Sequence, residues 1–371
     1  MKEDFQPLFE TFTFSNGIQL SNRIVMAPMT HSSSNADGTV SEAEINYYAR
    51  RAVSVGMVVT GSAAVAPNGG FPGMASADRD ELIPGLRDLA AAIQGKGAKA
   101  ILQIAHGGRK CPPFTQDIVS AGAVPEREGA VVPRELTDAE IPAIIRAFGE
   151  AARRAIEAGF DGVEIHGANG FLIQQFFSPH ANRRSDRWGG TLENRMAFPL
   201  AIVREVQRVV RLHAKQPFLI GYRLTPEETE TPGIMMGDTL ALVEALAAEH
   251  LHYLHLSQND FWSVSQRGIE DSRPRVEIIQ ERVGRQLPVI GAGSIRTASE
   301  AAQALKSGIP LVAMGREIVI EPDWLEKVAQ GREDEIKTTL SKADQQRLAI
   351  PDPLWGMIMR VPGWFPVEAE A

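Results

Sequence analysis

The chain has 371 residues and a hydrophobic fraction of 44%, which is enough apolar material for a large core and for one to three domains. Its net charge of -8, without a basic stripe, argues against nucleic acid as a partner, and no stretch approaches the roughly 18 apolar residues of a membrane span. Cys111 is the only cysteine, which excludes an internal disulfide and a cysteine-ligated iron–sulfur cluster and fits a reducing cytoplasm.

The N-terminal segment predicts a hairpin. The first residues, MKEDFQPLFE, contain acids and no apolar run, so we expect no secretory signal. The stretch FTFSNGIQLSN then places Asn16–Gly17 between residues that favour strands, which is a signal for a β-hairpin. We expect this hairpin to cap the bottom of the fold that follows.

Short apolar runs then recur, and a helical pattern follows each of them. Most runs are apolar on both faces, as expected of parallel strands that are covered on each side. The predicted strands are Arg23–Met29, Met57–Ser62, Lys99–Ile104, Asp161–His166, Pro217–Leu224, His252–Gln258, Leu287–Gly293 and Leu311–Arg316. Eight such units in series indicate an α/β fold, a (β/α)8 TIM barrel over about residues 23–330, with a doubly wound sheet as the alternative.

The intervening helices carry recognisable ends. Leu136–Gly159 is predicted to begin with Thr137 as N-cap, with Glu140 completing a capping box, and to end at its glycine. Thr191–His213 and Thr239–His250 also have amphipathic helical patterns. Because no linker rich in Ser, Gly or Pro interrupts the chain, we expect residues 1–371 to form a single domain.

A C-terminal extension follows the predicted barrel over about residues 331–371. It contains Trp355, Met357, Met359 and Trp364, which are apolar although they lie beyond the last barrel unit. Packing on the protein's own surface is the expected role. The alternative is a contact in a homo-oligomer that brings Arg360 or Trp364 near the active site of a neighbouring subunit.

Polar residues stand at several predicted strand ends, and in a barrel these ends converge on one face. The loops after the seventh and eighth strands of a barrel commonly bind a phosphate through their backbone N–H groups. Here those loops are GAGSIR, at Gly291–Arg296, and MGRE, at Met314–Glu317. Arg316 can add a charge-assisted hydrogen bond, so we predict a phosphate site at this place. An ordinary tight turn is the alternative.

The same stretches resemble a known family. RIVMAPMT, LQIAHGGR, EIHGANGFLIQQFFSPHANRRSDRWGGTLENR, GYRLTPEE, GAGSI and MGRE occur in the order found in the old yellow enzyme family. The resemblance runs from about Phe9 to about Val328. It implies a (β/α)8 barrel that binds FMN, takes hydride from NADH or NADPH and passes it to a small-molecule electron acceptor.

The resemblance also implies roles for individual residues. Pro28, Met29 and Thr30 match the first-strand segment against the flavin ring, and Ser62 matches the approach of the second strand. Gln103 matches the amide at the pyrimidine edge, and Arg223 matches the cation beside N1 and O2. A fixed cation there stabilises the negative charge of reduced flavin. Gly293, Gly315 and Arg316 match the phosphate site.

His166 and Asn169 match the pair that holds a substrate carbonyl oxygen or the nicotinamide amide. The chemistry supports this assignment, because hydride delivery to the β-carbon of an enone places negative charge on the carbonyl oxygen. Two hydrogen-bond donors directed at that oxygen stabilise the charge as it develops. A structural histidine and an asparagine turn are the alternative reading.

Phe171 departs from the family pattern. Ene-reducing members have a tyrosine at this position, two residues after the asparagine, which donates a proton to the substrate. Of the four tyrosines in the chain, Tyr47 and Tyr48 lie on the first helix and Tyr253 opens a strand at the wrong end. Tyr222 neighbours Arg223 on a strand and therefore faces the opposite side. Cys111 is a weak candidate for the missing donor.

Two readings of Phe171 follow. Water can supply the proton to an enone, since general-acid help is worth about 10²–10⁴-fold and its loss is survivable. Alternatively the physiological acceptor, such as a quinone, needs no protonation of carbon, and the phenyl ring forms an apolar wall of the substrate pocket. The sequence leaves both readings open.

Other classes of function have weaker support. A flavin-free lyase or isomerase could bind a phosphorylated substrate at the same loops, but no strand end carries a lysine. A flavin-binding module without turnover is the non-enzymatic alternative. No metal site is expected, because His252 and His255 lie on one strand and face opposite sides. The acidic run PEETETP is expected to be a solvated loop that can also touch a substrate or the nicotinamide.

Overall fold

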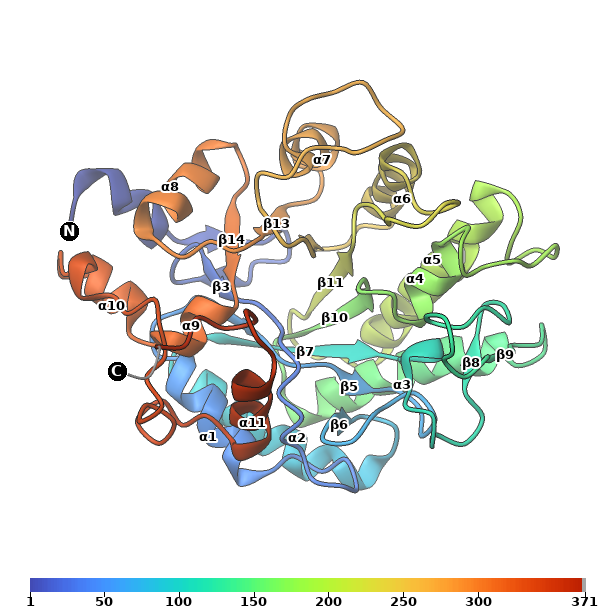
Figure 1. Ribbon diagram of the computed structural model, residues 1–371, viewed down its shortest axis with the longest axis horizontal. Coiled ribbons are helices and arrows are strands. Elements are labelled where there is room, and N and C mark those ends of the chain that lie inside the picture. The colour runs from blue at the N-terminus through green and yellow to red at the C-terminus, as the bar shows by residue number, and fades with distance from the viewer. Residues whose placement is uncertain (369–371) are drawn as a thin grey trace.

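Residues 1–368 are described by the computed structural model, and their centre is a closed barrel of eight parallel strands (Figure 1). In spatial order the strands are β10 (Gly162–Gly167), β11 (Leu219–Leu224), β12 (Tyr253–Leu256), β13 (Val289–Ala292), β14 (Leu311–Met314), β3 (Ile24–Met26), β4 (Met57–Val59) and β7 (Lys99–Ala105). β7 also pairs with β10, which closes the ring. The barrel prediction is therefore confirmed, and the doubly wound alternative is wrong.

Helices surround the strands, as Figure 1 shows. They are α1 (Glu42–Arg51), α2 (Ile83–Gln94), α3 (Ile141–Ala158), α4 (Leu172–Phe177), α5 (Leu192–His213), α6 (Met236–Ala248), α7 (Arg275–Val283), α8 (Ala298–Lys306), α9 (Arg316–Ile320), α10 (Trp324–Ala329) and α11 (Asp352–Arg360). Four 3-10 turns are η1 (Glu3–Phe9), η2 (Asp80–Leu82), η3 (Gly108–Lys110) and η4 (Glu333–Glu335). Across residues 1–368, none of these helices has the length and apolar character to cross a membrane.

Among residues 1–368, six further strands of two residues each lie outside the barrel ring. They are β1 (Phe12–Thr13), β2 (Gln19–Leu20), β5 (Ala63–Ala64), β6 (Ala75–Ser76), β8 (Val119–Ser120) and β9 (Arg134–Glu135). β1 and β2 form the predicted antiparallel hairpin, with Gly17 at φ 89° in its turn. Phe14 lies 6.0 Å from the Tyr253 ring, and Asn16 donates to the Phe218 carbonyl at 3.2 Å. The hairpin thus covers the N-terminal end of the barrel, as expected.

Two predicted helices have corrected boundaries. α3 begins at Ile141 rather than Leu136, because Thr137 and Glu140 form a separate turn in which the carboxylate accepts the Thr137 N–H at 2.8 Å. α6 begins at Met236 rather than Thr239, because the Asp238 carboxylate accepts the Met235 N–H and caps the earlier turn. The C-terminal glycine of α3 and Thr191 as N-cap of α5 are confirmed.

The side chains inside the barrel are apolar at its N-terminal end and polar at its C-terminal end. Successive residues of a strand point alternately inward and outward, and the inward Ile101, Leu219 and Tyr253 belong to the apolar cluster beside the hairpin. Gly221 leaves room for the Tyr253 ring, since a Cβ there would lie 2.0 Å from it. The next inward residues are polar: Gln103, Glu164, Arg223 and His255. Polar chemistry is therefore confined to the C-terminal end of the barrel.

The C-terminal extension folds back on its own chain. Leu354 and Ile358 of α11 are buried, and Leu340 forms a bridge with Val367. Arg51 of α1 is fully buried and donates to the Leu348 carbonyl at 2.8 Å, which ties the extension to the barrel. The expected packing on the protein's own surface is therefore observed.

Candidate active site

One cavity of about 390 Å³ brings together six residues that were predicted to contact the cofactor. They are Pro28, Met29, Arg223, Gly293, Gly315 and Arg316. These residues come from β11 and from the loops after β3, β13 and β14, so the cavity lies at the C-terminal end of the barrel. This is the face on which barrel enzymes place their chemistry.

The end of this cavity at Arg316 suits an anion. Gly293 has φ 149°, and a Cβ there would lie 2.2 Å from the Phe261 nitrogen, so only glycine fits. Arg316 donates to Ser294 Oγ at 2.6 Å and to the Trp364 carbonyl at 3.0 Å. Burial raises the pKa of Glu317, in the cavity wall, to about 8. This carboxyl is therefore largely neutral at pH 7 and does not repel a phosphate.

The other end of the cavity carries Arg223. Its side chain is buried, and its Nε has no hydrogen-bond partner among residues 1–368. Burial lowers the pKa of this guanidinium, while Glu164 acts in the opposite direction. A buried cation with an unused donor fits a flavin, whose N1 and O2 become negative on reduction. The residues present therefore fit FMN at both ends of the cavity.

Three further predicted cofactor residues lie beside this cavity rather than in its wall. Gln103 is buried and accepts from Ser62 Oγ at 2.5 Å. Ser62 and Thr30 instead line a small neighbouring hollow, where Thr30 is exposed. The two hydroxyls therefore lie together near the ends of β3 and β4, outside the wall of the larger cavity.

His166 is held as a neutral hydrogen-bond donor. Burial, together with the charge of Arg223, lowers the pKa of its imidazole to about 3. Its Nδ1 accepts the Ala168 N–H at 3.2 Å, so Nδ1 carries no proton. The single proton of the neutral ring is therefore on Nε2, which can donate to a carbonyl oxygen.

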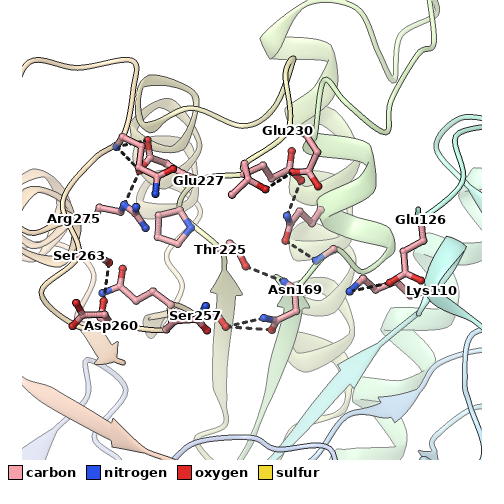
Figure 2. Close-up of a pocket in the computed structure, with 18 of the residues that line it drawn as sticks. Lys110, Glu126, Asn169, Thr225, Glu227, Glu230, Ser257, Asp260, Ser263 and Arg275 are labelled. Atoms are coloured by element: carbon pink, nitrogen blue, oxygen red, sulfur yellow. Dashed lines mark hydrogen bonds and ion pairs between the residues drawn. The ribbon is translucent and has the colours of Figure 1, made fainter. Parts of the chain in front are cut away.

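Asn169 faces a different partner. Its backbone has φ 56°, its N–H donates to Thr225 Oγ1 at 2.9 Å, and its Nδ2 donates to Ser257 Oγ at 3.1 Å. Asn169 lines a second cavity of about 610 Å³, shown in Figure 2, and Ser257 lines both cavities. The structure thus places His166 near the end of β10 and Asn169 in the loop that follows, and their side chains bind different neighbours.

The second cavity is rich in charge. Acidic side chains prevail in its wall, among them Glu227, Glu228 and Glu230 of the PEETETP run. Glu227 pairs with Arg275 at 2.6 Å, and Lys110 pairs with Glu126 at 3.5 Å, as Figure 2 shows. The acidic run after β11 therefore lies at the same end of the barrel as Asn169. This position is the one from which the sequence allowed it to touch a substrate or the nicotinamide.

Phe171 belongs to an aromatic wall beside His166. The two ring centroids are 4.5 Å apart, and the Phe71 ring meets Phe171 edge-on at 5.9 Å. Ala64, Met74 and Ala105 form a small apolar cluster against which Phe71 and Phe171 pack. Phe71 was not predicted, because its place in a loop after β5 carries no sequence signal that points to the site.

No tyrosine replaces the missing hydroxyl at Phe171. Tyr47 and Tyr48 are buried in α1, where the Tyr48 hydroxyl accepts the Gly61 N–H. Tyr222 packs in the outer core and Tyr253 lies in the apolar cluster beside the hairpin. Burial raises the pKa of Cys111 to about 12, and its thiol donates to the Asn68 carbonyl at 3.3 Å. The thiol is therefore an inert structural group.

Glu164 and His255 form a buried pair that sequence reasoning missed. His252 directly precedes β12 and its Nδ1 accepts the Ile220 N–H at 2.9 Å, whereas His255 points into the barrel, so the two imidazoles diverge as predicted. Its Nδ1 lies 2.9 Å from Glu164 Oε2. The available signal was an acid in the apolar strand DGVEIH, two residues before His166 and hence on the same face.

Comparison with known proteins identifies relatives of the whole chain. A family model described as NADH:flavin oxidoreductase / NADH oxidase family matches residues 7–335. The chain is 52% identical to the probable NADH-dependent flavin oxidoreductase YqiG of Bacillus subtilis (strain 168), over 99% of this chain and 100% of that protein. It is 41% identical to the NADH:fumarate oxidoreductase of Klebsiella pneumoniae (strain 342), covering 94% of this chain but 38% of that protein.

Solved structures with the same fold include morphinone reductase in complex with tetrahydroNAD. That structure superimposes with a TM-score of 0.75 at 26% identity, over 98% of each chain. The old yellow enzyme homologue from Zymomonas mobilis superimposes with a TM-score of 0.75 at 25% identity, over 87% of this chain and 92% of that chain.

Proposed function

The chain belongs to the NADH:flavin oxidoreductase / NADH oxidase family, and on that premise we propose how its barrel carries hydride from a nicotinamide donor to a small acceptor. It is an FMN-dependent NAD(P)H oxidoreductase of the old yellow enzyme type. The observation that supports the proposed site best is the neutral His166, which pairs in register with Arg223 in the wall of the cavity that also holds Arg316. Bound FMN would supply the chemistry of hydride transfer, from the nicotinamide in one half-reaction and to the acceptor in the next.

We assign the cofactor to the cavity of about 390 Å³. Arg316 and the Gly293 turn would hold the phosphate, and Gly315 would leave space beside it. Arg223 would face N1 and O2, with Gln103 at the pyrimidine edge. Pro28, Met29, Thr30 and Ser62 would contact the ring. Each of these residues then supplies shape or charge, and none takes part in covalent chemistry.

His166 and Asn169 act on the second reactant. The Nε2–H of His166 would donate to the carbonyl oxygen of the acceptor, where negative charge develops during hydride transfer. Asn169 would turn its amide from Ser257 to the same oxygen, or to the nicotinamide amide in the first half-reaction. Because both reactants use one site in turn, we expect a ping-pong cycle.

We place the dinucleotide donor in the acidic cavity of about 610 Å³ next to Asn169. A carboxylate can accept from the ribose hydroxyls of NADH, whereas it repels the 2′-phosphate of NADPH. Glu230 suits this role, because among residues 1–368 its carboxylate accepts a hydrogen bond only from the Thr229 hydroxyl, at 3.5 Å. We therefore propose NADH as the preferred donor. We also propose that the protein is a cytoplasmic enzyme whose partners are small molecules. Light scattering would show whether copies of the chain assemble into an oligomer.

The test of this function separates the two half-reactions under anaerobic conditions. We expect NADH to bleach the bound flavin faster than NADPH does. Mixing the reduced protein with cyclohexenone should restore the yellow colour and yield the saturated ketone. If only a quinone restores the colour, the acceptor is an electron carrier. A colourless protein, or one that neither nucleotide bleaches, would contradict the proposed function.

Replacement of Phe171 by tyrosine tests how the acceptor obtains its proton. Phe171→Tyr should speed reoxidation by cyclohexenone about 100-fold or more, because general-acid help is worth about 10²–10⁴-fold when protonation is slow. Quinone reduction needs no proton on carbon and should stay unchanged. Phe71→Tyr adds the same hydroxyl elsewhere in the aromatic wall and serves as the control. An equal enone rate in Phe171→Tyr and the parent would mean that protonation is not limiting.

A further inference from the structure

Glu164 is an acid inside the barrel. It lies in the middle of β10, its side chain is fully buried, and its face of the strand also carries His166. Burial alone would raise the pKa of this carboxyl, but His255 and Arg223 outweigh that effect, so the pKa is lowered and Glu164 is ionised. A buried carboxylate is costly unless its oxygens are hydrogen-bonded.

Both oxygens of Glu164 accept hydrogen bonds from residues on neighbouring strands. Oε1 accepts from Gln103 Nε2 at 2.7 Å, and Oε2 accepts from His255 Nδ1 at 2.9 Å. Burial and the charge of Arg223 lower the pKa of His255 although Glu164 acts in the opposite direction, and the neutral imidazole donates its Nδ1–H to the carboxylate. The pair therefore keeps one negative charge in the barrel.

The carboxylate fixes the orientation of Gln103. An ionised carboxylate only accepts hydrogen bonds, so Gln103 must direct its NH₂ group to Glu164. Its Oε1 then faces Ser62 Oγ at 2.5 Å. The amide keeps one N–H and one lone pair for another partner. That pattern suits the pyrimidine edge of a flavin, where acceptor oxygens alternate with an N–H.

Glu164 also acts on Arg223. His166 and Arg223 are register partners on β10 and β11, and Glu164 lies two residues before His166 on the same inward face. The two side chains face the barrel interior from neighbouring strands. Burial has the larger effect and lowers the pKa of Arg223, while the negative charge of Glu164 acts to raise it. The field that Arg223 exerts at the cofactor is therefore reduced by a second, deeper charge.

We propose that Glu164 is a positioning residue for the cofactor: it orients Gln103 and partly offsets Arg223, and it thereby lowers the midpoint potential of bound FMN. This inference rests on the proposed function. A lower potential makes the reduced cofactor a stronger hydride donor to the acceptor. The carboxylate thus counteracts a cation that would otherwise hold the electrons too tightly.

The test is the midpoint potential of the FMN-loaded protein, measured by spectroelectrochemistry. In Glu164→Gln the shape is kept and the charge is lost. Reduced FMN should gain about tenfold in affinity relative to oxidised FMN, a rise of about 30 mV for two electrons. Glu164→Asp keeps the charge and should stay near the parent value.

Glu44→Gln is the matched control. Glu44 is a buried carboxylate paired with His31 at 3.2 Å, but it lines none of the cavities described above. Its replacement should leave the potential unchanged even if it lowers the melting temperature. If loss of stability caused the change, the midpoint potential would shift in both variants. If the charge of Glu164 causes it, the potential shifts only in Glu164→Gln.

If Glu164→Gln does not retain FMN, Glu164→Met combined with His255→Leu replaces the pair by apolar side chains, an exchange that proteins often tolerate. It should show the same rise in potential. An unchanged or lower potential in these variants would overturn the proposal. Failure of the proposed function is seen separately, since the parent protein would then fail to bind FMN or to be bleached by NADH.

Discussion

Arg316→Ala should release FMN. The guanidinium would make charge-assisted hydrogen bonds to the phosphate, and bonds to charged groups are worth about 1.5–3 kcal/mol each. We expect the dissociation constant of FMN to rise about 10- to 150-fold, which is the same free energy expressed as affinity. Titration of the apoprotein with FMN, followed by quenching of flavin fluorescence, measures this constant directly.

The controls for this variant separate charge from shape. Arg316→Lys keeps the charge but loses the planar fork, so its affinity should fall between those of the parent and Arg316→Ala. Arg360→Ala removes an exposed arginine of the C-terminal extension that lies outside the cofactor cavity, and it should bind FMN as the parent does. Full FMN retention in Arg316→Ala would place the phosphate elsewhere.

His166→Ala should slow transfer to an enone. Loss of one donor to a developing oxyanion costs about 10²–10³ in rate, so reoxidation by cyclohexenone should fall by that factor while FMN content stays constant. Affinity for a phenolic ligand at the carbonyl site should weaken too. In the parent protein the pKa of His166 is about 3, so the imidazole is neutral from pH 5 to pH 8. The affinity of the parent for the phenolic ligand should therefore show no change in this range that is linked to His166.

His106→Ala is the matched control for His166. His106 is also buried, its pKa is lowered by burial to about 4, and its Nδ1 accepts the Gly108 N–H in the same local geometry. His106 follows β7 and lies 3.4 Å from Asn68 Oδ1, whereas His166 pairs in register with Arg223 in the wall of the cofactor cavity. An equal loss of ligand affinity in both variants would remove His166 from the carbonyl site.

Much of the barrel could be predicted from local patterns. Each strand is a short apolar run, and turn signals such as Asn16–Gly17 depend on only a few neighbouring residues. Closure of the ring was harder, because it depends on pairing between β7 and β10, which no local pattern encodes. The predicted starts of α3 and α6 were wrong, because hydrogen bonds at the helix ends place the starts at Ile141 and Met236.

Some residues of the candidate site could likewise be predicted from the sequence, and others could not. Residues in long specific motifs, such as Arg223 and Arg316, were predicted and meet in one cavity. The pair of Glu164 and His255 was missed, because its members are 91 residues apart and neither position stands out alone. Asn169 was predicted, but its present hydrogen bonds to Ser257 depend on a strand end 88 residues later.

The contact between Arg316 and Trp364 bears on when the site is assembled during synthesis. The wall of the cofactor cavity starts at Ala27 and includes Trp364, so its parts span almost the whole chain. Contacts between such distant residues form slowly, because the ends of a long loop must first meet. A nascent chain emerges from its N-terminus. The barrel strands can therefore pair on the ribosome before the last wall of the cavity exists.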